Sequence, residues 1–228
     1  MRDILSPVDP NGDIPVPAFP RTRLESFLAG TDGAPPRQQL VHALRLVDGG
    51  RGAERELTAL DIGCGPGKEA LELLRFGFRV TAIDPFRSML DATTHLVARS
   101  APALGDRLEP ILDTIEGFAP RLRQRRYDLV HAGFVLPFVR ASDFPGVFDA
   151  IRASLNPGSI FVGQLFGEHD EFVVQAEPGT MVHHSSADID GLFEGFDILV
   201  REEVRRDGHI GRGRAKHWHV HHIISRRM

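Results

Sequence analysis

The segment Leu60–Gly67 reads Leu-Asp-Ile-Gly-Cys-Gly-Pro-Gly, so glycines stand at alternate positions directly after a short apolar run. Glycine lacks a Cβ atom and adopts backbone conformations that other residues avoid, so the pattern predicts a tight turn from a strand into a helix. A second apolar run ends in Ile83-Asp84. An acid after the second strand accepts both hydroxyls of a ribose in nucleotide-binding α/β folds. We therefore expect a site for a nucleoside cofactor.

The chain has 228 residues, of which 42% are hydrophobic and 25% are charged. This size and composition are typical of one α/β domain with its own core. No apolar run is long enough to span a membrane, and residues 1–20 lack the basic start and apolar core of a signal peptide, so we expect a cytoplasmic protein. The formal net charge of −4 argues against a general nucleic-acid binder, and we interpret the basic run 121–126 as a solvated surface.

Apolar periodicity predicts alternating strands and helices from residue 38 onward. We expect strands at 57–62, 78–83, 108–112, 127–134 and 159–166, and helices at 38–47, 68–75, 86–99, 144–155 and from Ser185 or Ser186 to Phe193. Such alternation predicts a parallel sheet with helices on both faces. Two further runs, 196–204 and 217–224, lack a long helix between them, so we expect a hairpin joined near Asp207-Gly208 with one antiparallel strand. Pro110 indicates an edge position for the third strand.

Residues 1–35 form a proline-rich arm in this interpretation, with a short helix from Arg21 to Leu28. The arm is expected either to be disordered or to fold over the ligand as a lid. Residues 36–228 are expected to form one domain.

The glycine spacing departs from the dinucleotide pattern Gly-x-Gly-x-x-Gly, because Lys68 stands where the third glycine would fall. Together with Val80–Asp84, Tyr127–Val130 and Leu155–Gly158, the segment Leu60–Gly67 resembles the class I S-adenosylmethionine-dependent methyltransferases. The resemblance covers the chain from about Gln38 to its end. It implies an α/β fold, a Rossmann-like three-layer sandwich whose seven-stranded sheet is mostly parallel, with one antiparallel strand in a C-terminal hairpin.

Within this family, Val135-Leu136-Pro137-Phe138 is most similar to the small-molecule branch that includes tellurite and thiopurine methyltransferases. The resemblance also implies a cofactor, S-adenosylmethionine, which is converted to S-adenosylhomocysteine. The glycine turn would face its methionine part, and Asp84 would hold its ribose. The implied cofactor-binding residues are Asp61 near the amino group, Gly63, Cys64, Gly65, Gly67, Asp84, Pro85 or Phe86 beside the adenine, Asp113 and Thr114 near the adenine amino group, and Ala132 or Gly133 beside the sulfonium. We interpret Cys64, the single cysteine, as a packing residue of the turn rather than a nucleophile.

Substrate-binding residues are expected at the carboxyl ends of the fourth and fifth strands and just after them. The candidates are Phe134, Gln164, Phe166, Glu168 and Asp170. The acidic loop at 168–171 suits a cationic or amine-bearing substrate, with a solvated loop as the alternative.

A general base is needed only if the nucleophile must lose a proton, and the candidates are His217, His219 and His131. His217, His219 and His221 alternate along one strand face, with His222 on the other. Three imidazoles on one surface can bind zinc. However, the sequence spacing does not place an acid or a cysteine beside them as a further ligand, so we expect no metal.

These patterns predict a methyltransferase that moves a methyl group to a nitrogen, oxygen or sulfur atom of a small metabolite by in-line displacement. The acidic loop favours nitrogen. The alternatives are a tRNA or protein methyltransferase, or a non-catalytic regulatory protein that binds the cofactor on the same fold. We expect a monomer or homodimer with no membrane partner.

Overall fold

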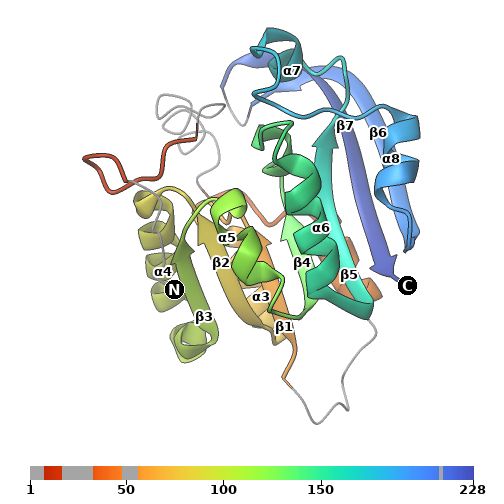
Figure 1. Ribbon diagram of the computed structural model, residues 1–228. Helices are drawn as coiled ribbons and strands as arrows, with labels where there is room; N and C mark the ends of the chain where they lie inside the picture. The colour runs from red at the N-terminus through yellow and green to blue at the C-terminus, as the bar shows by residue number, and fades with distance from the viewer. Residues whose placement is uncertain (1–7, 17–32, 48–55, 211–212) are drawn as a thin grey trace.

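The computed structural model describes residues 8–16, 33–47, 56–210 and 213–228. Its seven strands form one sheet in the order β3-β2-β1-β4-β5-β7-β6 (Figure 1). The strands are β1 Thr58–Ile62, β2 Arg79–Asp84, β3 Leu108–Leu112, β4 Tyr127–Ala132, β5 Leu155–Phe166, β6 Phe196–His209 and β7 Ala215–Arg227. The helices are α2 Gln38–Leu46, α3 Lys68–Phe76, α4 Arg87–Ser100, α5 Ile115–Leu122, α6 Phe144–Ser154, α7 Glu171–Gln175 and α8 Ser186–Leu192, with 3-10 turns η1 Pro102–Arg107 and η2 Leu136–Phe138.

Strands β1 to β5 are mutually parallel, whereas β7 runs antiparallel to both of its neighbours, β5 and β6. The expected seven-stranded, Rossmann-like sheet with one antiparallel strand is therefore confirmed. The chain moves outward from β1 to β3 and then returns to place β4 on the other side of β1. In open α/β sheets this reversal opens a crevice at the carboxyl ends of the two central strands, where ligands bind.

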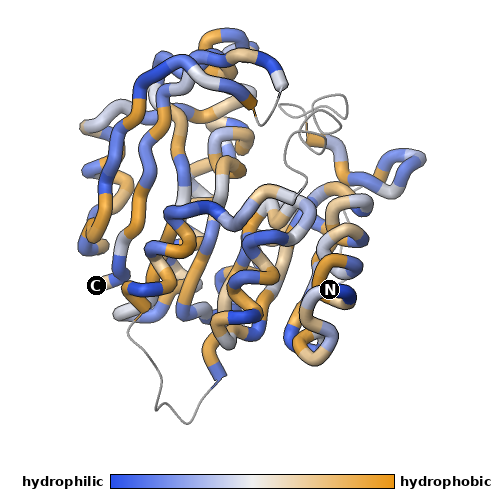
Figure 2. The backbone as a smooth tube through the Cα atoms, turned by 180° about the vertical axis from the view of Figure 1, so that it is seen from behind, coloured by the Kyte–Doolittle hydropathy of each residue, from blue (hydrophilic) through white to orange (hydrophobic). Residues whose placement is uncertain are grey.

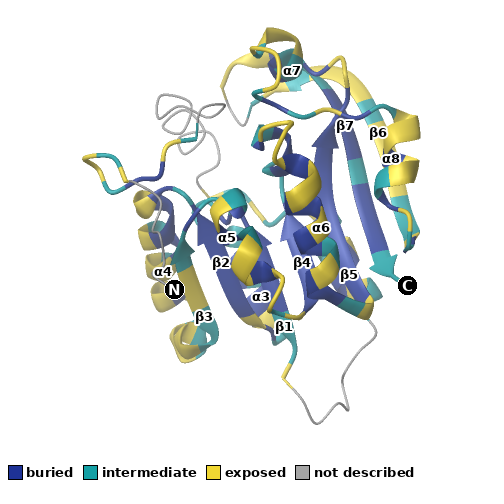
Figure 3. Cartoon of the chain, in the orientation of Figure 1, coloured by how far each residue is buried: buried dark blue, intermediate teal, exposed yellow. Residues whose placement is uncertain are grey.

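Helices cover both faces of the sheet. On one face, α5, α6 and α8 pack on a core that includes Phe118, Phe148, Phe161 and Phe193. On the other face, the layer of α2, α3 and α4 forms a second core, and Figure 2 shows this layer from its own side with hydrophobic and hydrophilic residues mixed along each helix, as expected of helices with one buried side. The central strands are buried, whereas the edge strands β3 and β6 carry many exposed residues (Figure 3).

Pro110 lies in β3, which pairs only with β2, so its predicted edge position is confirmed. The predicted helix ending at Phe193 also forms, and Ser185 begins it with a capping box that pairs it with Asp188. The helix expected at Arg21–Leu28 lies outside the described residues.

Three local predictions differ from the structure. Helix α5 was not predicted, because Gly117 and Pro120 interrupt its periodicity, and its last turn takes up the start of the basic run 121–126. The hairpin turn does not lie at Asp207-Gly208, because these residues pair with His217 and Lys216 and continue the ladder. Alternation of apolar residues fails along this part of β6 because an edge strand tolerates charged residues on both sides. The segment 156–158 is an irregularity inside β5 rather than a turn before it.

Residues 8–16 of the arm dock beside the turn between β2 and α4. The amide of Ile14 donates to the carbonyl oxygen of Pro85 at 2.8 Å, and Asp13 Oδ1 accepts from the amide of Arg87 at 2.8 Å. Asp13 and Ile14 are both buried. This part of the arm, red in Figure 1, therefore lies next to the turn between β2 and α4.

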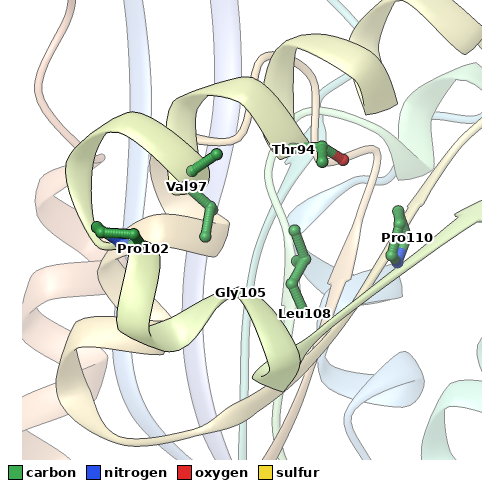
Figure 4. Close-up of a pocket in the computed structure, with 7 residues that line it drawn as sticks. Thr94, Val97, Pro102, Gly105, Leu108 and Pro110 are labelled. Atoms are coloured by element: carbon green, nitrogen blue, oxygen red, sulfur yellow. The ribbon is translucent and has the colours of Figure 1, made fainter.

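A separate surface hollow of about 210 Å³ lies between α4, η1 and β3 (Figure 4). Its lining is mainly apolar and includes Val97, Pro102 and Leu108. Leu108 begins β3, so the hollow lies toward the amino end of the strands and away from the crevice. None of the described helices is both long and apolar enough to cross a membrane.

Candidate functional site

The glycine turn joins β1 to α3 in a conformation that requires glycine. Gly63, Gly65 and Gly67 have φ angles of 65°, 54° and 88°, all in the left-handed region. A Cβ atom on Gly63 would lie 2.9 Å from a Val135 methyl group, and one on Gly67 would lie 2.7 Å from Thr93. The turn is therefore both bent and closely packed, as a backbone that approaches a ligand must be.

Asp84 ends β2 and ties this turn to the next one. Its Oδ2 accepts from the amide of Gly65 at 2.9 Å, and its Oδ1 accepts from the amide of Phe86 at 3.0 Å. Burial raises the pKa of Asp84 to about 7, although the two amide donors oppose that shift. The predicted ribose acceptor thus lies where the turns after β1 and β2 meet.

Cys64 is buried in the turn, where burial, Asp84 and Asp61 raise the pKa of its thiol well above the ordinary value. A thiol with a raised pKa is a poor nucleophile at neutral pH. The environment of Cys64 therefore supports its interpretation as a packing residue.

Asp61 and His131 form a buried pair across β1 and β4. Asp61 Oδ1 lies 2.6 Å from His131 Nδ1, and both side chains are almost completely buried. Burial raises the pKa of Asp61, and His131 opposes the shift. Neither Asp61 Oδ2 nor His131 Nε2 has a hydrogen-bond partner in the described part of the chain. Both atoms therefore retain hydrogen-bonding capacity at the carboxyl edge of the sheet.

Three charged residues surround this pair. The Arg37 amide donates to Glu69 Oε1 at 3.3 Å, and Lys68 Nζ donates to the same oxygen. The Arg37 guanidinium lies over the ring of Phe134, 4.7 Å from its centroid. Burial raises the pKa of Glu69, but the charges of His131, Arg37 and Lys68 outweigh that effect and hold it below its ordinary value.

None of these three charged residues was predicted as part of the site. Lys68 and Glu69 begin α3 directly after the glycine turn, and this position was the signal that could have identified them. Arg37 precedes α2 and is distant in sequence, so no local pattern points to it.

These groups fit S-adenosylmethionine, which carries an ammonium, a carboxylate and a ribose. The unpartnered, buried oxygen of Asp61 suits an ammonium donor. Arg37 and Lys68 supply positive charge for a carboxylate. The left-handed turn at Gly63 leaves the backbone open to close approach, and Asp84 retains lone pairs for ribose hydroxyls.

Asp113 follows β3 beside Asp84, and its amide donates to the Asp84 carbonyl oxygen at 3.3 Å. Its carboxylate pairs with Arg121 of α5, and burial raises its pKa against the effect of Arg121. The hydroxyl of Thr114 accepts from the Gly117 amide at 3.1 Å and caps α5. Asp113 therefore lies beside Asp84 at the ends of β3 and β2, whereas the Thr114 hydroxyl is used for helix capping.

The structure gives Asp170 a different role from the predicted one. Its carboxylate accepts from Lys216 Nζ at 2.6 Å and caps α7 through the Phe172 amide at 3.0 Å. Both partners of this ion pair are fully buried. Glu168 is exposed and pairs with His169 at 3.0 Å. Two acids of the loop are thus already paired, because Asp170 is the counter-ion of the buried Lys216 and Glu171 pairs with Arg214.

Phe134 and Phe166 belong to one aromatic cluster. The Phe134 ring lies 6.0 Å from that of Phe166 and 5.7 Å from that of Trp218, edge to face in the second case. Phe134 has a φ angle of 58°, the one positive φ angle at a residue other than glycine in the described segments. This strained conformation turns the chain at the end of β4, beside the crevice.

Strand alternation separates the candidate bases. Ile224 of β7 packs with α2 and α3, whereas Ile223 packs with α5 and α6. His217 and His219 share the face of Ile223, whereas Asp61 and His131 lie on the opposite face with Leu129. Of the three predicted bases, only His131 is therefore on the face of the charged cluster.

His217 and His219 already have partners on their own face. His217 Nδ1 lies 2.8 Å from Asp207 Oδ1, and His219 Nε2 lies 2.9 Å from Glu203 Oε1. The structure therefore does not bring His217 and His219 to the cofactor side, because a one-residue difference in position reverses the face of a side chain.

Glu203, His219 and His221 place one ligand atom each within 4.8 Å of one another, which is compatible with a metal ion. However, His219 Nδ1 accepts from the His169 amide at 3.2 Å. His219 Nε2 in turn lies 2.9 Å from Glu203 Oε1, so a metal ion bound here would take the place of the proton in that contact.

Comparisons with known proteins agree with this geometry. Residues 36–221 match a family model described as a methyltransferase domain. Alpha N-terminal protein methyltransferase 1 of Arabidopsis thaliana is 25% identical over 136 residues, which are 56% of this chain and 49% of that protein. The chain thus spans about half the length of this curated relative.

Solved structures share the fold. TehB from Haemophilus influenzae gives a TM-score of 0.69 at 15% identity, covering 90% of this chain and 66% of TehB. The N-methyltransferase NodS from Bradyrhizobium japonicum, in complex with S-adenosylhomocysteine, gives 0.63 at 17% identity, covering 92% of this chain and 98% of NodS. At these identities the similarity establishes a common fold.

We expect Gly67→Ala to lower the free energy of unfolding by about 1 to 2 kcal/mol, because a side chain is unfavourable at a crowded position with a left-handed backbone. The reason is the φ angle of 88° and the clash of a Cβ atom with Thr93 at 2.7 Å. Urea unfolding measures the change. Gly146→Ala in α6 is the control, because a Cβ atom there meets nothing within 4 Å, and its stability should equal or exceed that of the wild type. Equal stability of the two variants would contradict the assigned strain.

Proposed function

Because this chain belongs to the methyltransferase-domain family of S-adenosylmethionine-dependent enzymes, we propose that it methylates a nitrogen, oxygen or sulfur atom of a small molecule. The observation that carries the proposal is the buried Asp61 carboxylate beside the glycine turn, which keeps one oxygen unpartnered among the described residues. A bound ammonium would satisfy that oxygen. The nearby Arg37 and Asp84 supply matching chemistry for the carboxylate and the ribose of the cofactor.

A second candidate substrate is the N-terminus of a protein, because the Arabidopsis relative is named for that activity. The formal net charge of −4 and the ion pairs that Asp170 and Glu171 already make give no separate support to a peptide or nucleic-acid substrate. We therefore favour a small molecule.

When bound, S-adenosylmethionine supplies an electrophilic methyl group on a positively charged sulfur. The protein then has to hold the acceptor atom in line with that methyl group and exclude water. Gly133 lies at the end of β4 where a Cβ atom would be 2.7 Å from His131 Cε1 and 3.2 Å from Arg37 Nε. The absence of a side chain at Gly133 leaves the edge of the His131 ring beside the predicted position of the sulfonium.

His131 is the proposed base for an acceptor that must lose a proton. When its Nδ1 carries the proton shared with Asp61, its Nε2 lone pair can take the proton from the acceptor. The Asp61 carboxylate then stabilises the imidazolium, as the acid of an acid–histidine pair does. Asp61 would therefore serve both the cofactor and the base.

We expect Asp84→Ala to lower the affinity for S-adenosylhomocysteine at least tenfold, or about 1.4 kcal/mol, because the ribose loses its acceptor. Isothermal titration calorimetry measures the affinity, and thermal unfolding confirms that the variant is folded. Asp91→Ala on the exposed side of α4 is the matched control and should bind like the wild type. An unchanged affinity of Asp84→Ala would refute the assigned contact.

The affinity for S-adenosylhomocysteine should also depend on pH. The pKa of Asp84 is raised to about 7, and the ribose hydroxyls bind the ionised carboxylate. Below pH 7 the free protein is protonated at this group and must lose the proton to bind, so the affinity should fall roughly tenfold between pH 8 and pH 6. Calorimetry in buffers of different ionisation enthalpy should show proton release, and Asp84→Asn should abolish both effects. A pH-independent affinity of the wild type would disprove the linkage.

His131→Asn should reduce turnover by about 10² to 10⁴-fold for an acceptor that loses a proton, the usual contribution of a general base. Turnover is measured by transfer of a labelled methyl group to a panel of amine, thiol and phenol acceptors. His217→Asn should retain turnover, because His217 lies on the opposite face and contacts Asp207. Cofactor binding without turnover on any acceptor would instead favour a regulatory protein.

A further inference from the structure

Gln164 of β5 is a polar residue in an otherwise apolar part of the sheet. Its side chain is completely buried, and neither Oε1 nor Nε2 has a hydrogen-bond partner among the described residues. Ile160 and Val162, which share its face, belong to the apolar core beneath α2 and α3. A buried amide that leaves both its donor and its acceptor unused lowers the stability of the fold. A buried amide without a protein partner calls for an explanation, and binding of a ligand is one.

Strand pairing shows what surrounds Gln164. It lies directly opposite His222 of β7, whose Nδ1 is also buried and has no partner in the described segments. On the other side, Ala132 pairs with Gly163, so Gln164 lies beside Gly133, the residue that follows β4. Gly133 is in turn packed against the Nε2 edge of His131. His131, Gln164 and His222 therefore form a row across three neighbouring strands, which we call the polar row.

An aromatic wall adjoins the polar row. The Phe134 ring contacts the ring of His222 edge to face at 6.3 Å and that of Trp218 at 5.7 Å. The Arg37 guanidinium lies over the same Phe134 ring at 4.7 Å. These planar groups favour a flat ligand next to the hydrogen-bonding groups.

The polar row offers neutral hydrogen-bonding groups rather than a net charge. Burial lowers the pKa of His222, and of the charged groups that face it, Glu202 opposes the shift while Arg37 and Arg206 add to it. His222 is therefore a neutral imidazole at physiological pH. The Arg37 charge is directed to Glu69, whose Oε1 lies 3.7 Å from Arg37 Nε, and to the cofactor carboxylate that the proposed function assigns to it. A charged ligand group next to Gln164 would lose its hydration without a counter-ion, which is unfavourable.

We propose that the polar row is the substrate-recognition site, and that it binds the edge of a neutral, planar molecule that carries a hydrogen-bond acceptor next to a donor, as in a lactam or a carboxamide. This inference rests on the proposed function, because it places the substrate beside the methyl-transfer centre. The amide of Gln164 pairs with such an edge, His222 completes the contact, and the acceptor atom lies beside His131 Nε2. The polar row, rather than the acidic loop, thus selects the substrate by its charge and favours a neutral one.

The test uses the full-length protein saturated with S-adenosylhomocysteine and a matched set of bicyclic probes. These are 2-quinolinone as the neutral lactam, N-methylquinolinium as the cation and quinoline-2-carboxylate as the anion. We expect calorimetry to show that the lactam binds at least tenfold more tightly than either charged probe. Tighter binding of a charged probe, or no binding of the lactam at millimolar concentration, would overturn the inference.

Gln164→Leu should weaken lactam binding at least tenfold while the apparent melting temperature of the unliganded protein stays equal or rises. The melting temperature is diagnostic, because leucine removes an unpaired amide from the core. A lower melting temperature would mean that the Gln164 amide is satisfied internally, and it would overturn the inference. Gln124→Leu, the same change at an exposed residue beyond α5, is the control and should bind the lactam like the wild type.

His222→Phe gives a second test that keeps the ring shape and removes the hydrogen bonds, and it too should lower lactam affinity. S-adenosylhomocysteine affinity separates the two proposals. If the wild type binds S-adenosylhomocysteine and the substitutions leave lactam affinity unchanged, the assigned recognition site is wrong and the proposed function stands. If the wild type does not bind S-adenosylhomocysteine, the proposed function itself fails.

Discussion

The two backbone hydrogen bonds accepted by the buried carboxylate of Asp84 hold the crevice in shape. One comes from Gly65 in the turn after β1 and the other from Phe86 in the turn after β2. The hydroxyl of Thr93 in α4 also donates to the Gly65 carbonyl oxygen at 2.8 Å, so the glycine turn is held from the second turn and from the helix that follows it. Burial makes the ionised carboxylate less stable, which is why the pKa of Asp84 rises to about 7. The same shift makes the group sensitive to any ligand that can stabilise its charge.

The residues that stabilise the fold and the residues that could bind a ligand lie in different parts of the sheet. The cores beneath the two helical layers are apolar and closely packed, and they extend to the middle of every central strand. At the carboxyl edge, Asp61, His131, Gln164 and His222 replace apolar residues on one face, and each keeps a buried atom that no described residue satisfies. Similar atoms occur on the other face, as in His184 and His221, but these four residues lie together at the carboxyl edge beside the glycine turn. Ligand binding is a reason for keeping them there.

Much of the fold could be predicted from local sequence. Apolar periodicity, the glycine turn and Pro110 identify elements and an edge strand because they act over a few residues. The site was only partly predictable, since contacts between distant segments decide it. The pairing of Asp170 with Lys216 links residues 46 positions apart, and Arg37 reaches Phe134 from before α2. Because Lys216 is buried, it needs Asp170 as its counter-ion, although we expected Asp170 at the surface. No spacing rule in the sequence reveals this pairing.

The choice among the histidines shows the limit most clearly. The sequence places His217, His219 and His221 on one face of β7 and His222 on the other, but it does not state which face meets the crevice. The pairing of β7 with β5, in which Gln164 lies opposite His222, decides this. A shift of one residue in that pairing would exchange the two sets of imidazoles. The chemistry of the site therefore depends on the register of β7 against β5, a property of the folded sheet rather than of any motif.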